Sequence, residues 1–161
     1  MKRLLLILFA LVVIIPASNS ASAQEEGDFR FGFRTGYYFR TNAFVIGAYG
    51  NYGITNWLNV EPGISYVCKE KSTVDVYCDF QIPLEIATYW HVYPIVGLSI
   101  NDISEKSGTI DGWAGGLNIG LGTTYNLNGH WNISAQGKWM GRFPREHTSA
   151  VIIAVGIDYN F

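Results

Sequence analysis

The sequence is poor in charge, cysteine and proline, and each scarcity narrows the class of protein. Charged residues make up 15% of the 161 residues, with two cysteines and five prolines. After residue 23, no apolar run approaches the roughly 18 residues that a membrane-spanning helix needs. Removing Lys2 and Arg3 with the expected leader leaves nine basic against 13 acidic side chains, which argues against nucleic acid as a partner. If the chain enters a membrane, it does so as strands.

The first 23 residues have the pattern of a cleaved signal peptide. Lys2 and Arg3 precede an apolar stretch from Leu4 to Ile15, and Ala21-Ser22-Ala23 is a small-residue cleavage site. The remaining residues, 24–161, suit one domain. Export also places the two cysteines where a disulfide can persist.

Glycine and aromatic residues are plentiful and favour strands and tight turns. The chain has 18 Gly, five Trp, ten Tyr and nine Phe. Period-two alternation begins at Phe29, Phe31 and Phe33, between charged residues and glycine. The same pattern predicts eight strands, at residues 28–39, 43–54, 57–68, 76–90, 92–101, 112–127, 131–140 and 149–161. Their lengths suit tilted strands that cross a bilayer.

The connections between these strands alternate in length. Short ones are expected at Thr55-Asn56, around His91 and at Asn128-Gly129-His130, and longer charged ones at Lys69–Asp75, Asp102–Asp111 and Gly141–Thr148. Only the short Arg40–Asn42 breaks the pattern. Such alternation is typical of an eight-stranded antiparallel transmembrane up-and-down β-barrel with periplasmic turns and outer loops.

One parity of the eight strands carries no Asp, Glu, Lys or Arg, as the lipid face of a barrel requires. The opposite parity predicts a packed polar interior, because an eight-stranded barrel is just wide enough to be filled by side chains. Its charged members are Arg30, Arg34, Glu61, Asp79, Glu85, Lys138 and Asp158. Arg30 and Asp158 are expected to be neighbours where the first and last strands meet. Arg34, Glu61, Glu85 and Lys138 are expected to balance one another near mid-height, in a structural core network and not in a transport or catalytic site.

Five tryptophans lie at predicted strand ends, where they are expected to form an aromatic girdle at each interface. These residues are Trp57, Trp90, Trp113, Trp131 and Trp139.

The spacing of Cys68 and Cys78 predicts a disulfide at the mouth of the third hairpin. If paired positions sum to 146, Cys68 faces Cys78, Tyr66 faces Phe80 and Ile64 faces Ile82, all on the apolar parity. Directly opposed residues have Cα separations of about 4.5–5.5 Å, which suit a disulfide. Two free thiols on the apolar face are the alternative.

The histidines predict no catalytic or metal centre, because His91 and His130 belong to one rim and His147 to the other. A site would have to combine His147 with Ser104, Ser107, Asp102 or Asp111. The glycine-rich stretch Gly112–Gly122 lacks the Lys-Ser/Thr of a phosphate-binding loop. Its inward Gly116, Gly120 and Gly122 are expected to make room for large residues such as Tyr49, Tyr89 or Tyr93. Neither an enzyme activity nor a cofactor is therefore expected.

The carboxyl end alternates through Ile157 and Tyr159 to a terminal Phe161. This pattern resembles the signal by which the barrel assembly machinery recognises outer-membrane barrels.

Residues Phe80–Tyr89 (FQIPLEIATY) resemble the "IPL" strand of a family of small outer-membrane β-barrels that includes PorT-like and OmpX-like proteins. Tyr93–Leu98 (YPIVGL) is similar to the family's next strand, and the glycine-rich sixth strand and Phe161 also match. The resemblance implies the barrel and an outer-membrane location in a Gram-negative type bacterium; it brings no agreed substrate or catalytic residues.

A non-enzymatic barrel is the expected function, presenting its outer loops for binding, adhesion or envelope integrity. Outer-membrane lipid, the assembly machinery and an extracellular or envelope protein are the expected partners. A small channel or a component of a translocation or secretion system is the alternative, and a lipid-modifying barrel enzyme is third.

Overall fold

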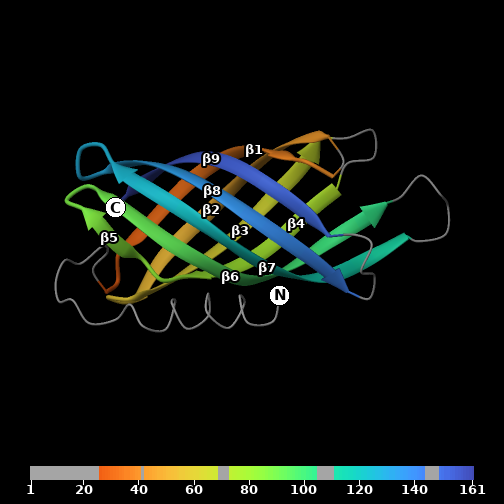
Figure 1. The fold of residues 1–161 in the computed structure, drawn as a ribbon, viewed down its shortest axis with the longest axis horizontal. Helices are drawn as coiled ribbons and strands as arrows, with labels where there is room; N and C mark the ends of the chain where they lie inside the picture. Colours follow the sequence, from red (N-terminus) through yellow and green to blue (C-terminus); the bar gives the residue numbers. More distant parts are fainter. Residues whose placement is uncertain (1–25, 41, 69–72, 105–110, 144–148) are drawn as a thin grey trace, which may run out of the picture.

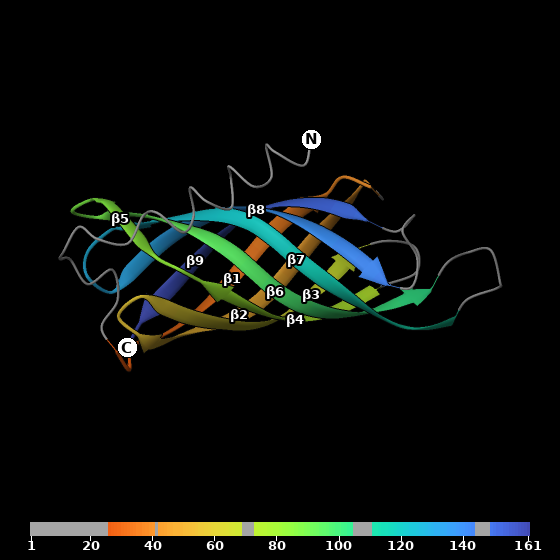
Figure 2. The same ribbon diagram turned by 60° about the horizontal axis from the view of Figure 1, so that its bottom comes forward.

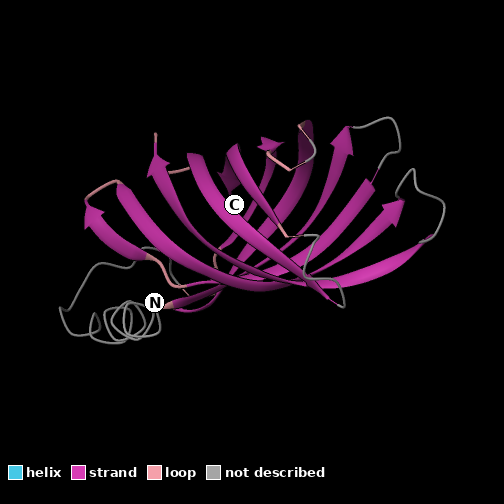
Figure 3. Cartoon of the chain, turned by 45° about the vertical axis from the view of Figure 1, so that its right-hand side comes forward, coloured by secondary structure: helices cyan, strands magenta, loops and turns pink. Residues whose placement is uncertain are grey.

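The computed structural model describes residues 26–40, 42–68, 73–104, 111–143 and 149–161. Every regular element of this described part is a strand (Figure 3). The strands are β1 (Phe29–Tyr38), β2 (Ala43–Thr55), β3 (Leu58–Cys68), β4 (Thr73–Gln81), β5 (Leu84–Ala87), β6 (Trp90–Ser104), β7 (Asp111–Asn126), β8 (Trp131–Phe143) and β9 (Ala150–Asn160). No helix long and apolar enough to cross a membrane occurs within these ranges.

The strands close into one antiparallel barrel (Figures 1 and 2). Apart from β4 and β5, each strand pairs with its sequence neighbour; β9 pairs with β1, and both β4 and β5 pair with β6. Nine strands are labelled, but β4 and β5 together occupy one position in the barrel wall. The barrel therefore has eight strand positions, which we call staves, and this confirms the expected eight-stranded fold. We call the end that holds the β2–β3, β5–β6 and β7–β8 connections the turn end, and the opposite end the loop end.

The fourth stave, made of β4 and β5, is interrupted at residues 82–83, where two prolines lie on the adjacent strands. Gln81 pairs with Ile95 and Leu84 with Val92, so the register continues across the gap. Pro83 and Pro94 fall inside it, and neither has an N–H to donate to the ladder. The single strand expected at 76–90 is therefore divided into β4 and β5, and the turn lies at residues 88–89 instead of at His91.

The outer face of the barrel is apolar and carries no charge among the strand side chains that the structure describes. Phe33, Ile46, Leu98, Leu121 and Val155 are among the large side chains exposed there. The expected two-faced pattern thus holds around the barrel.

Aromatic side chains gather at both edges of this face. Tyr37 contacts Phe39 and Phe44 edge-on at the loop end. Tyr159 contacts Trp131 and Phe161 at the turn end. The exposed Trp57, Trp90, Trp131 and Trp139 belong to this face, whereas the side chain of Trp113 lies outside the described part.

Candidate functional site

The middle of the barrel holds a buried, bidentate ion pair between β1 and β3. Arg34 Nη1 lies 2.7 Å from Glu61 Oε1, and Nη2 lies 3.2 Å from Oε2. The guanidinium also lies over the Tyr49 ring, 3.9 Å from its centroid, and donates to Tyr77 Oη at 3.2 Å. Gln81 donates to Glu61 Oε2 at 2.7 Å. Both charges are thus compensated inside the barrel, as burial requires.

A second ion pair joins β8 to β4. Lys138 Nζ lies 2.6 Å from Asp79 Oδ2 and 4.0 Å from the centroid of the Tyr77 ring. Asn118 donates to the other carboxylate oxygen at 2.8 Å and accepts a hydrogen bond from Ser99 at 3.1 Å. Asp79 is fully buried and Lys138 is 5% exposed.

A third cluster lies toward the turn end. Arg30 approaches Asp158 at 3.9 Å and donates to Asn51 at 3.1 Å. Asp158 accepts hydrogen bonds from Tyr49 at 2.7 Å and from Asn132 at 2.8 Å. The two sides of the barrel's closing seam are therefore linked by polar side chains inside.

The expected mid-height set of four charges needs one correction. The acidic partner of Lys138 is Asp79, not Glu85. Glu85 lies in β5, half-buried, opposite His91 at the turn end. The sequence-based count placed Glu85 too far from the turn end. The fourth stave continues past Pro83 as β5, so Glu85 lies near the turn.

Asp75 was expected in an outer loop but is buried inside the barrel. It belongs to β4, faces Asn101 of β6 and accepts a hydrogen bond from that side chain.

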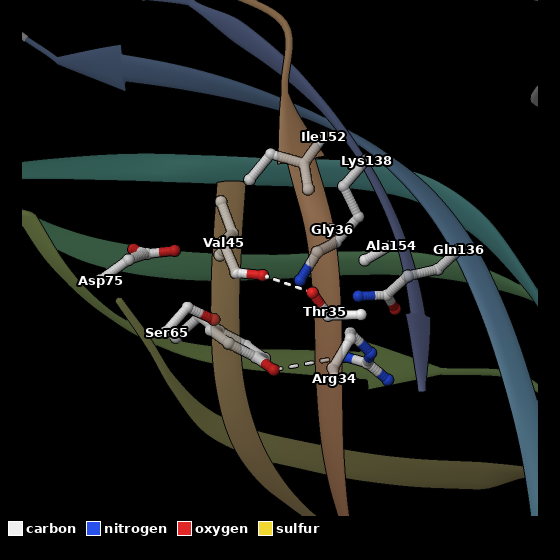
Figure 4. A pocket seen from close by; sticks show the side chains of 11 residues that line it. Arg34, Thr35, Gly36, Val45, Ser65, Asp75, Gln136, Lys138, Ile152 and Ala154 are labelled. Carbon is white, nitrogen blue, oxygen red and sulfur yellow. Dashed lines mark hydrogen bonds between the residues drawn. The ribbon is translucent and has the colours of Figure 1, made fainter. Parts of the chain in front are cut away.

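In the described part of the interior, Arg34 lines two small cavities, one toward the loop end and one toward the turn end. One measures about 20 Å³ and lies among Asp75, Gln136, Lys138 and their neighbours (Figure 4). The other measures about 10 Å³ and adjoins Gln81 and Asp158. A cavity of ~10–15 Å³ on this measure holds about one water molecule. The polar filling thus leaves room for single waters near Arg34.

Toward the loop end one side of the interior is apolar, a feature that sequence reasoning missed. Tyr38, Ala43, Val45, Val67, Met140, Ala150, Ile152 and Ala154 form this buried cluster. The signal lies in Ala150–Val155, where both parities are apolar. An alternating strand with a polar inner face cannot produce such a run.

The predicted disulfide is wrong: both cysteines are free and lie on the outer face. Paired positions of β3 and β4 sum to 140, so Cys78 faces Pro62, whereas Cys68 pairs with Phe44 on β2. The six-residue offset separates the cysteines by roughly 20 Å along the strands. A disulfide cannot span that distance.

The expected space for large residues is present at Gly122, where an added β-carbon would overlap the Tyr93 ring. Tyr49 instead lies against Gly32, and Tyr89 is exposed at the turn end.

The two histidines that the structure describes, His91 and His130, contact different residues. His91 is half-buried in β6, and His130 stacks on Tyr159 near the same end of the barrel. His147 lies outside the described residues, as do Ser107 and the expected leader, residues 1–23. Among the described residues, no group of three or more His, Cys, Asp or Glu side chains is placed to hold a metal ion.

At the loop end, β6 and β7 form a ribbon that outreaches its neighbours (Figure 1). Their pairing continues to Ser104 and Asp111. By contrast, the pairing of β4 with β6 ends at Asn101. The last described residue of β8, Phe143, pairs with Gly115 of β7.

The model of the outer membrane protein beta-barrel domain family matches residues 7–161, so the chain belongs to this family. No curated protein matches the chain.

Solved structures share the fold at low sequence identity. The N-terminal β-barrel domain of Pseudomonas aeruginosa OprF is 16% identical, with a TM-score of 0.73 over 86% of this chain and 100% of that one. Neisserial surface protein A is 13% identical, with a TM-score of 0.61 over 83% and 95%. Ail, the attachment invasion locus protein of Yersinia pestis, is 15% identical, with a TM-score of 0.56 over 84% and 99%.

Proposed function

We propose that this outer-membrane barrel is a binding protein that displays its loop end to a partner outside the cell or within the envelope. The observation that carries the proposal is the filled interior. Two buried ion pairs cross the middle of the barrel, and the cavities beside Arg34 have room for only about one water each. A binding role therefore rests on the ends of the barrel, where connections are free to vary.

The β6–β7 ribbon supports this role. Residues 102–104 of β6 and 111–113 of β7 pair with each other. Among the described residues, Asp102 and Ile103 have no partner on β4, whose pairing with β6 ends at Asn101. The outer backbone edge of Asp102 and Ile103 is therefore left for hydrogen bonds to another chain, as in strand addition. The name of Ail, a similar barrel, refers to attachment, and one of its structures contains the heparin analogue sucrose octasulfate.

Export and assembly belong to the same proposal. The leader 1–23 directs the chain out of the cytoplasm and is cleaved. Phe161, Tyr159 and Ile157 then present an apolar terminal strand to the barrel assembly machinery. Phe161 is exposed, and its N–H donates to Phe29 O at 3.1 Å where the barrel closes.

A replacement of residues 105–110 by a Gly/Ser segment of equal length tests the proposal. Cells with the native barrel should bind at least one member of a panel of immobilised extracellular-matrix proteins and heparin, and the replacement should abolish that binding. A matched replacement of residues 128–130 at the turn end should leave it unchanged. Equal binding by the native and 105–110 variants to every member would contradict the proposal.

A small channel or translocation component is the second candidate, since the cavities flank Arg34 on both sides. Planar-bilayer recording distinguishes the two. The binding barrel should show no single-channel steps above the noise, and regular steps would favour the channel.

A further inference from the structure

An apolar groove runs across the outer face of the barrel over β8, β9, β1 and β2. It has a volume of about 520 Å³, and its lining includes Phe33, Thr35, Ile46, Ile133, Val155 and Ile157. This groove is distinct from the interior network and from the loop end.

The strand register explains the hollow. Ala135, Val155 and Thr35 are consecutive partners across β8, β9 and β1, and they form a row of small side chains. The adjacent row consists of Ile133, Ile157 and Phe33, whose larger side chains stand above it. A row of small side chains next to a row of large ones leaves a groove on the surface of the sheet.

The groove presents almost only hydrocarbon, because the side chain of Arg34, a residue that also lines it, points inward to Glu61. Thr35 is the polar side chain at its floor, and its hydroxyl donates to Val45 O at 3.2 Å, as Figure 4 shows. The hydroxyl is thereby satisfied within the sheet. The groove also lies between the aromatic edges at Tyr37 and at Phe161, within the apolar band. Its surroundings are therefore those of an acyl chain.

A cation lies beyond the groove at the loop end, on the chain that continues from β1. Arg40 is exposed, and its Nη1 donates to Ser149 O at 3.1 Å, which holds the guanidinium over the seam of β1 and β9. Five residues separate Thr35 from Arg40; at ~3.3 Å each and a strand tilt of ~40°, Arg40 lies about 13 Å higher and about 11 Å to the side, along the direction of the strand. This rise is about half of the ~25 Å apolar band, so a chain in the groove brings its headgroup to the level of Arg40.

We propose that the groove binds one acyl chain of an anionic glycerophospholipid whose phosphate is bound by Arg40. Guanidinium groups recognise phosphate through paired, charge-assisted hydrogen bonds. One guanidinium can bind one phosphate and the groove can hold one acyl chain, so a lipid with a single phosphate fits this surface.

Native mass spectrometry of the full-length protein in detergent tests the proposal, with phosphatidylglycerol and phosphatidylcholine of identical chains as probes. The native protein should retain one phosphatidylglycerol about tenfold better than phosphatidylcholine, the factor expected from a charge-assisted hydrogen bond. Arg40→Gln should remove that preference while leaving phosphatidylcholine retention unchanged.

Filling the groove should act differently. Val155→Trp should lower the retention of both lipids. Val96→Trp is the matched control, because Val96 lies on the outer face of β6, is 57% exposed against 52% for Val155, and lies away from both the groove and the β1–β9 seam. Heat-modifiable gel migration verifies that each variant is folded, and Thr35→Leu provides a second, smaller filling change.

Three results would overturn the proposal. They are equal retention of both lipids by the native protein, an equal loss in the two Trp variants, and displacement of phosphatidylglycerol by a phosphorylated glycolipid or by a second copy of the chain.

Discussion

Replacing Lys138 with methionine should destabilise the barrel strongly, because it leaves a buried carboxylate without its cation. Lys138 Nζ lies 2.6 Å from Asp79 Oδ2, and Asp79 is fully buried. Removing one partner of a buried pair costs about 3–5 kcal/mol. The lost contact with the Tyr77 ring adds to this cost, whereas the remaining hydrogen bond from Asn118 reduces it. We therefore expect the free energy of unfolding to fall by about 3–4 kcal/mol.

A double-mutant cycle separates the lost charge pair from lost packing. In Lys138→Met/Asp79→Asn the uncompensated charge is gone, and the new amide oxygen still accepts from Asn118. The double variant should regain about 2 kcal/mol relative to Lys138→Met alone. The assay is reversible urea unfolding in phosphatidylcholine vesicles, followed by tryptophan fluorescence and gel migration. A loss below about 1 kcal/mol, or single changes that add to within ~0.5 kcal/mol, would refute the reasoning.

Three further predictions concern packing, register and assembly. Gly122→Val should cost about 1–3 kcal/mol in the same assay because Tyr93 lies against the glycine, whereas Gly137→Val, at an open position, should change little. Alkylation without reductant should label both Cys68 and Cys78, and a mass that indicates one bridge would contradict the register. Deleting Phe161 should lower the yield of heat-modifiable barrel without lowering export; an undiminished yield would count against its role in assembly.

Side-chain parity could be predicted from the sequence because burial enforces it. A slip of one residue moves every side chain of a strand to the wrong face, so the alternation at Phe29, Phe31 and Phe33 specifies which face is outside. The number of staves and the inward position of Arg34, Glu61 and Asp79 follow from the same rule.

Register could not be obtained in the same way. The expected and observed pairings of β3 and β4 differ by six, an even number, so both keep the same faces. Tyr66 meets Val74 in the structure and was expected to meet Phe80, and the two matches are equally apolar. Apolar complementarity therefore does not distinguish these registers. The height of Glu85 and the partner of Lys138 depend on that choice.

A different signal does distinguish them, and it lies on the inner face. Three buried tyrosines each face a glycine on the neighbouring strand: Tyr49 faces Gly32, Tyr77 faces Gly63, and Tyr93 faces Gly122. In each pair the ring lies where the β-carbon of any other residue would be.

Two of these rings also support the buried cations, Tyr49 under Arg34 and Tyr77 under Lys138. Space for the ring and stabilisation of the charge are thus coupled, since a cation gains from an aromatic face that is shielded from water. Pairing inward tyrosines with inward glycines would have placed Gly63 opposite Tyr77, which is the observed register. In a narrow barrel the inner face, where volume is limiting, therefore carries register information that the lipid face lacks.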